Sequence, residues 1–173
     1  MKNTIRLLLA GVVAVLLFSP GCKKSETATG PAGSGSASGT ASFTLDGAGV
    51  SNQTFSMSNV SGFFSTNDNA TSIVGVGVSG ADTINMVIAF PGSTTGTFQF
   101  DVSSAGVVLI NSSGIMTSGT GNGQIAVTAF GAVGGSVTGT FSGRLYELDL
   151  SMGIVDSAQV SNGSFNATRL PNQ

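Results

Sequence analysis

Glu147 and Asp149 are the residues whose type and spacing come nearest to acid–base chemistry. On an extended strand, residues two apart point to the same face, about 6.5–7 Å from each other. Two carboxylates placed in this way suit a carboxylate-dependent glycoside hydrolase or a Ca²⁺ site. Near-adjacent acids on one strand are more often a solvated face, so we assign no catalytic residue to this pair.

Catalysis and metal binding that depend on histidine or on several cysteines need residues that this chain lacks. The sequence has no histidine and a single cysteine, Cys22. Ser-His-Asp and Cys-His catalysis, His-ligated metals and multi-cysteine zinc sites are therefore excluded. We expect no enzyme activity, no cofactor and no metal site.

Residues 75–80 match the pattern GxGxxG, which binds dinucleotides only where a helix follows it. The residues that follow, ADTINMVIAF, alternate as a strand does, so we read these glycines as strand and turn.

The charge balance excludes another class of partner. The chain has six Lys and Arg against eight Asp and Glu, and only Arg144 and Arg169 lie beyond residue 24. A nucleic-acid surface needs clustered basic residues, so we expect no nucleic-acid partner.

The N-terminus has the composition of a secretory signal. Lys2 and Arg6 precede an apolar run of 12 residues, 7–18. As a helix this run spans roughly 18 Å, which is too short for a bilayer core of about 30 Å. A basic start, a short apolar run and small residues are typical of a signal peptide.

Ser19-Pro20-Gly21-Cys22 resembles the lipobox of bacterial lipoproteins, although Ser19 stands where that family prefers Leu. The resemblance implies that residues 1–21 are a lipoprotein signal peptide and that Cys22 is acylated. Two or more acyl chains anchor a protein stably to a membrane. Residues 22–26, CKKSE, are also similar to the start of Bacteroidota lipoproteins, which implies the outer membrane, at its periplasmic or its surface face.

Residues 22–40 hold the cysteine and a Gly/Ser/Ala-rich segment without periodicity, which predicts a flexible tether. Residues 41–173 are enough for one domain.

The apolar pattern of this domain has a period of two, and turn residues separate the segments. In residues 73–78, for example, Val74, Val76 and Val78 alternate with Gly75 and Gly77 and predict an apolar valine face. The pattern favours an all-β fold, an antiparallel β-sandwich or a barrel-like single domain. The predicted strands are 42–46, 53–58, 61–66, 72–79, 83–90, 96–102, 105–110, 123–130, 135–149 and 157–169.

Two places break the alternation. The apolar face shifts by one residue after Leu145, which predicts a bulge or bend there. Asn162-Gly163 is either a hairpin turn or a bulge within one strand. A triplet of Gly, Ser or Thr, and Phe recurs at residues 96–98, 139–141 and 163–165, which we read as a turn glycine entering a strand.

The segments SVTGTFSGRLYEL and AQVSNGSFNATR look like the C-terminal half of small, uncharacterised Bacteroidota lipoproteins. The resemblance implies a β-sandwich region whose motifs are structural, so it transfers no catalytic residue.

The candidate contacts with a ligand or partner are those whose side chains break the core pattern or carry polar groups: Phe63, Phe64, Tyr146, Glu147 and Asp149. Asp82-Thr83-Ile84 and Asp156-Ser157-Ala158 resemble short O-glycosylation sites of Bacteroidota, which makes Thr83 and Ser157 candidate acceptors.

These features together predict a lipid-anchored protein of the cell envelope with a non-enzymatic, structural or partner-binding domain. The membrane is expected through lipidated Cys22, and an envelope protein or a glycan is the candidate partner. One alternative is a carbohydrate-binding accessory lipoprotein of a glycan-uptake system, and a second is a carboxylate-dependent glycoside hydrolase.

Overall fold

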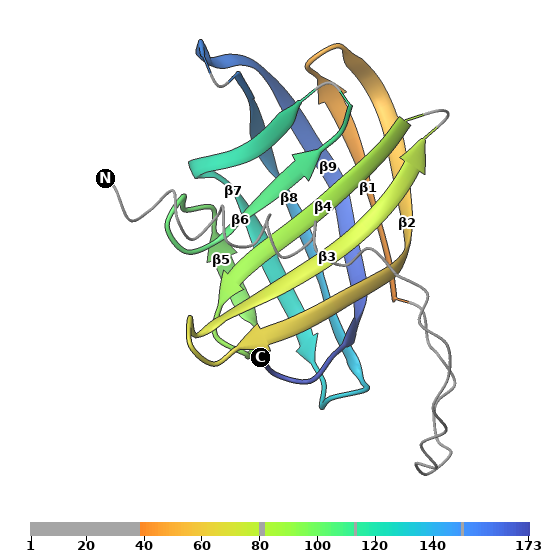
Figure 1. Ribbon diagram of the computed structural model, residues 1–173, viewed down its shortest axis with the longest axis vertical. Coiled ribbons are helices and arrows are strands. Elements are labelled where there is room, and N and C mark those ends of the chain that lie inside the picture. The colour runs from red at the N-terminus through yellow and green to blue at the C-terminus, as the bar shows by residue number, and fades with distance from the viewer. Residues whose placement is uncertain (1–38, 80–81, 113, 150) are drawn as a thin grey trace, which may run out of the picture. The chain divides into compact units, whose positions relative to one another are not determined.

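The computed structural model describes residues 39–79, 82–112, 114–149 and 151–173 (Figure 1). The predicted signal peptide, Cys22 and the tether up to residue 38 lie outside the described residues. The strands are β1 (Gly39–Gly47), β2 (Val50–Ser65), β3 (Ala70–Ser79), β4 (Asp82–Pro91), β5 (Gly96–Gln99), β6 (Gly106–Ile110), β7 (Ile115–Phe130), β8 (Ser136–Asp149) and β9 (Gly153–Arg169).

Eight of these strands close into an antiparallel barrel. The order is β7-β6-β4-β3-β2-β1-β9-β8, and β8 pairs with β7 to complete the ring (Figure 1). The all-β prediction is confirmed, and of the two architectures left open the structure has the barrel. Closure leaves no long sheet edge exposed, which is the usual hazard of an antiparallel sheet.

The extra strand, β5, lies in line with β6. β5 pairs with residues 124–127 of β7, and β6 pairs with residues 115–117 of the same strand. Residues 101–105 loop out between them and are held by the Asp101–Ala105 bridge. The strand predicted over 96–102 therefore stops at Gln99, and Val102 is exposed instead of core-facing.

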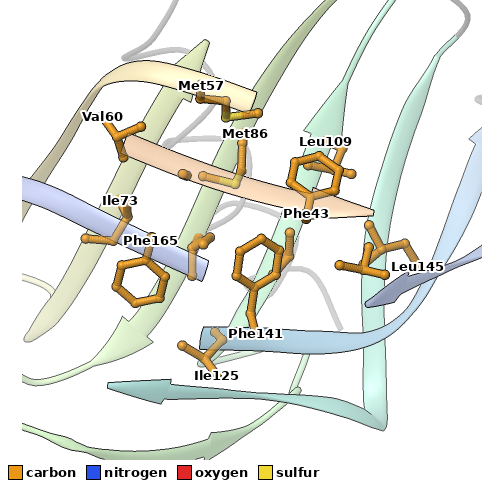
Figure 2. Close-up of a cluster of buried hydrophobic side chains, with 14 of the residues drawn as sticks. Phe43, Met57, Val60, Ile73, Met86, Leu109, Ile125, Phe141, Leu145 and Phe165 are labelled. Carbon is orange, nitrogen blue, oxygen red and sulfur yellow. The ribbon is translucent and has the colours of Figure 1, made fainter. Parts of the chain in front are cut away.

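The interior of the barrel is filled with apolar side chains from every strand of the ring. Figure 2 shows Phe43, Phe141 and Phe165 among Ile, Leu, Val and Met side chains of this core. The Phe43 ring stacks on Phe55 at 5.3 Å between centroids and tilts against Phe141 at 5.8 Å. The centre of the barrel is thus a packed core, as in other barrels of about eight strands.

The recurring Gly-(Ser/Thr)-Phe triplets have a packing role that the sequence pattern did not reveal. The triplets of β8 and β9 pair with each other, so that Gly139 is opposite Phe165 and Phe141 is opposite Gly163. An added Cβ on Gly139 would lie 2.5 Å from the Phe165 ring, and one on Gly163 would lie 2.9 Å from the Phe141 ring. Each glycine makes the space that the opposite ring occupies.

The valines of β3 share one face as predicted, but that face lies on the outside of the barrel and not against the core. Gly75 and Gly77 face the interior, whereas Val76 is 51% exposed and Val78 is 66% exposed. A Cβ on Gly77 would lie 2.7 Å from the Met57 side chain. The long side chains of the facing strand fill the core here, so β3 turns its glycines inward and its valines outward.

Several strand boundaries also differ from the prediction. The segments 53–58 and 61–66 form one strand, β2, in which Asn59 has a φ of 61° at a register shift. Asn59 and Val60, which lie between the segments, belong to a bulge and not to a turn. Residues 39–40, assigned to the tether, open β1, and β9 begins at Gly153, four residues before its predicted start.

The β7 strand begins at Ile115, eight residues before the predicted strand at 123. Ser118 pairs with Leu145 and Gly123 with Gly143, so residues 119–122 bulge out opposite a single residue of β8. Their composition, GTGN, is that of a turn, which is why the sequence did not show a continuous strand.

The two predicted irregularities have different outcomes. Asn162 lies in a bulge within β9 and has a φ of 53°, which agrees with the bulge alternative and excludes the hairpin. Leu145 itself is fully buried and pairs regularly with Ala158. The register shifts lie on either side of it, and the extra residues are on β9, because that strand takes up the coiling of the barrel wall.

Candidate functional site

The two ends of the barrel differ in construction. One end carries the β1–β2, β3–β4, β6–β7 and β8–β9 connections, and we call it the hairpin end. The other end carries Gly39, the first described residue, and the C-terminal segment, whose Gln173 pairs with Phe64 and Thr66 of the β2 end. We call this second end the entry end.

The β8–β9 hairpin projects from the hairpin end (Figure 1). The last residue of β1, Gly47, pairs with Ala158, so residues 153–157 of β9 continue past β1. Five residues of strand extend about 16 Å at about 3.3 Å each. We call residues 147–149 and 151–156 of this hairpin the arm.

The outer face of the arm is apolar and continues around the barrel. Leu148 is opposite Ile154 on β9 and opposite Ile115 on β7, and Ile115 is opposite Ile110 on β6. The sequence neighbours Leu109 and Met116 are buried inside the barrel, so this row points outward. We call Ile110, Ile115, Leu148 and Ile154 the apolar row.

The exposure of these side chains is greatest at the arm. Met152 is 75% exposed, Ile154 is 64% exposed and Val155 is 46% exposed. On the other side of β6, Ile110 is opposite Asn85 on β4, and Asn85 is opposite Val76 on β3. With strands about 4.8 Å apart, the four strands of the apolar row span about 14 Å.

The opposite side of the barrel is polar. Ser42 lies beside Ser164 with 3.2 Å between hydroxyl oxygens, and Thr44 lies beside Thr54 at 3.3 Å. The outer surface therefore has a hydroxyl-rich side over β1, β2 and the adjoining part of β9, whereas the apolar row crosses β6 to β9 near the hairpin end.

The inner face of the arm carries carboxylates. Glu147 on β8 pairs directly with Asp156 on β9. Side chains opposite each other in an antiparallel pair lie about 4.5–5.5 Å apart at Cβ, and like charges there are destabilising. The arm is thus amphipathic, with an apolar outer face and an acidic inner face.

Asp149 has a local structural role at the tip of the arm. Its Oδ1 accepts hydrogen bonds from the Ser151 hydroxyl, from the Ser151 N–H at 2.7 Å and from the Met152 N–H at 2.9 Å. These donors, the Ser151 hydroxyl first, hold the pKa of Asp149 below its ordinary value of 3.8. Asp149 therefore stabilises the β8–β9 turn as a carboxylate.

Acidic residues gather at the hairpin end as a whole. By position in the strands, five of them lie there: Asp46, Asp82, Glu147, Asp149 and Asp156. Of the two arginines in the described residues, Arg144 lies on β8 near this end and Arg169 lies at the entry end.

No protein-family model, curated protein or solved structure matches this chain. Within the described ranges, no group of three or more His, Cys, Asp or Glu side chains is placed to hold a metal ion. The same part of the chain has no helix with the length and hydropathy needed to cross a bilayer.

The structure brings three of the predicted contact residues together and separates the other two. Tyr146, Glu147 and Asp149 lie on one stretch of β8, and the Tyr146 hydroxyl accepts a hydrogen bond from Asn122 Nδ2 at 2.9 Å. Phe63 and Phe64 lie near the end of β2, at the entry end, where both are half-buried. Phe63 and Phe64 therefore do not belong to the arm.

The two candidate glycosylation residues also lie near the hairpin end. Thr83 is exposed on β4 opposite Val78, and Ser157 is half-buried opposite Tyr146. Both hydroxyls are on strands and not on loops.

Sequence reasoning missed the apolar row. Its residues come from four strands: Ile115 and Ile154 lie outside the predicted strands, and Ile110 is the last residue of one of them. The one available signal was Ile154-Val155, two branched apolar residues between a turn glycine and an acid. Only the register places them beside Leu148 and Ile115.

Proposed function

We propose that this chain is a lipid-anchored protein of the cell envelope whose barrel is a non-enzymatic, partner-binding module. Cys22 supplies the anchor, as the resemblance of residues 19–22 to a lipobox implies. Residues 23–38 connect this anchor to Gly39, the first residue of β1. The outer membrane, at its periplasmic or surface face, is the proposed location.

The observation that carries the binding role is the apolar row, half-buried at Ile110 and Ile115 and exposed at Leu148 and Ile154, together with the arm. Burying apolar surface contributes roughly 25 cal/mol per Å², so an exposed row of this kind favours association. Contiguous exposed apolar surface on a soluble domain usually marks an interaction site. The filled interior directs this role to the outside of the barrel.

The arrangement of carboxylates supports a non-enzymatic role. Asp149 is engaged by the turn that it stabilises, and the side chain opposite Glu147 is another carboxylate, Asp156. Both carboxyl groups of a glycoside hydrolase must act on the scissile bond, whereas the Asp149 carboxylate accepts its hydrogen bonds from its own turn.

The anchoring is tested by metabolic labelling with radioactive palmitate. The wild-type chain should be labelled and should fractionate with membranes, and globomycin should cause its precursor to accumulate. The Cys22→Ser chain should be unlabelled and should leave the membrane fraction. An unlabelled wild-type chain contradicts the anchor.

The binding role is tested separately by chemical cross-linking in the intact cell. A wild-type chain that gives no adduct with another macromolecule contradicts it. A glycan array probed with the same chain distinguishes a carbohydrate partner from a protein one.

A further inference from the structure

The arm is the part of the apolar surface with the strongest need for a partner. Ile154 and Met152 are more than half exposed, and Leu148 continues their surface to β7. The hairpin extends past β1 on the β9 side, where residues 153–156 are exposed. A partner that covers both faces must enclose the arm.

The edge of the arm does not favour the addition of a strand. Leu148 pairs with Ile154 and Glu147 pairs with Asp156, so Val155 is an extra residue that makes a bulge in β9. Bulges and edge charges blunt a strand against pairing with another strand. Binding through side chains is therefore favoured over backbone pairing.

The negative charge of the hairpin end favours a partner with a basic surface. Five acidic residues lie there with one arginine, Arg144, beside them. Charges within about 8–10 Å act on each other at physiological salt. A second copy docking by the same end, or a surface of anionic lipid, brings more negative charge to this end. A surface with Lys or Arg removes the repulsion between Glu147 and Asp156.

We infer that the arm is the docking element for a partner protein whose binding groove has one apolar wall and one basic wall. The apolar wall covers Leu148, Met152 and Ile154. The basic wall faces Glu147 and Asp156, where Lys or Arg side chains form ion pairs with the opposed carboxylates. This inference rests on the proposed partner-binding function and adds to it the binding element and the chemistry of the partner.

The experiment places a photo-cross-linking amino acid at Ile154 in the full lipidated chain, in the bacterium that makes it. The control carries the same amino acid at Val133, which is 54% exposed at the entry end. The expected result is an adduct with a different protein from position 154 and none from position 133. The cross-linked peptide of that protein should contain Lys or Arg.

A second pair of variants tests the chemistry of the contact. Glu147→Gln with Asp156→Asn should reduce the yield of the adduct at least five-fold, while the Tm stays the same or rises because the opposed charges are gone. Met152→Ser in the arm should also reduce the yield, and Thr44→Ser on the hydroxyl-rich side should not.

Each other outcome overturns the inference. These outcomes are an adduct of two copies of this chain, an adduct with lipid only, no adduct from position 154, and a yield unchanged by the charge variant. An adduct from position 133 alone overturns the arm as the docking element but leaves the proposed binding function. Palmitate labelling of Cys22 in the same cells reports on the anchor independently.

Discussion

At the scale of the residue, the core depends on glycines placed opposite phenylalanines. Gly139 and Gly163 are buried, and each receives the ring of a phenylalanine from the neighbouring strand. A small barrel has little interior volume, and large rings fit there only where a facing position has no side chain.

Gly139→Ala should destabilise the barrel by about 1–3 kcal/mol, the usual cost of overpacking a core. Its Cβ would lie 2.4 Å from the Ala126 carbonyl oxygen and 2.5 Å from the Phe165 ring. Urea unfolding measures the change. Thr140→Ala, at the exposed neighbour, is the control and should change stability by less than about 0.5 kcal/mol. Equal effects of the two variants would contradict the packing role.

Asp149 makes the arm sensitive to acid. Because its pKa is lower in the folded chain than the ordinary value of 3.8, it stabilises the fold above that pH, and this contribution is lost as pH falls through the lowered pKa. Ser151→Ala removes the strongest hydrogen bond and should raise the pKa of Asp149 toward 3.8, as followed by NMR titration of the carboxyl carbon.

The matched control for this titration is Ser103→Ala. Ser103 makes the same kind of hydrogen bond to Asp101 and likewise lowers the pKa of that residue. This variant should raise the pKa of Asp101 and leave that of Asp149 unchanged. A pKa of Asp149 that does not respond to Ser151→Ala would show that the turn is held in another way.

At the scale of the element, the β1–β2 hairpin depends on two residues with a left-handed backbone conformation. The β1–β2 turn has two central residues, Ala48 and Gly49, with φ values of 50° and 76°, between the paired residues Gly47 and Val50. This is the geometry of a type I′ turn, which favours Asn-Gly. A left-handed conformation costs a residue with a Cβ roughly 1–2 kcal/mol, less for Asn.

Ala48→Asn should therefore stabilise the protein by about 0.5–1 kcal/mol, seen as a higher midpoint of urea unfolding with an unchanged m-value. The control is Ala132→Asn in the β7–β8 connection, where the backbone does not have a positive φ. Ala132→Asn should have no such effect. A loss of stability in Ala48→Asn would show that the turn is not type I′ in solution.

At the scale of the whole molecule, the entry end is closed by Arg169. Its Nη1 donates to the Gly131 carbonyl at 2.6 Å, its Nη2 donates to Asn172 at 3.0 Å, and its guanidinium lies 4.7 Å from the centre of the Phe130 ring. One side chain thus joins the end of β9 to the end of β7 and to the C-terminal segment.

Arg169→Ala should cost about 2–3 kcal/mol, the sum expected for a charged hydrogen bond and a cation–π contact. The stability of Arg169→Lys should lie between those of the wild type and Arg169→Ala, because lysine keeps the positive charge but not the planar set of donors of the guanidinium. Arg144→Ala is the control, since Arg144 is exposed on the barrel wall. Thermal unfolding distinguishes the three, and equal Tm values for the two alanine variants would exclude this closing role.

The local pattern predicted most of the strands but not which side of each strand faces the core. Residues 83–90 and 135–149 were placed well because bulky apolar residues alternate there with polar ones. In β3 the alternation of Val and Gly is equally regular, yet the glycines face inward, because Met57 and Ile84 occupy the space beside Gly77. A period of two identifies two faces and does not say which one a neighbouring strand will fill.

The sequence by itself determined that the domain is all-β, that it lacks histidine and that its acids far outnumber its bases, since these follow from composition and period. Only the tertiary structure decided that the sheet closes into a barrel, that Glu147 faces Asp156, and that Ile110, Ile115, Leu148 and Ile154 share one outer row. The physical reason is register: a shift of one residue between paired strands exchanges every side chain between the core and the surface, and register is set by bulges and by partners distant in the chain.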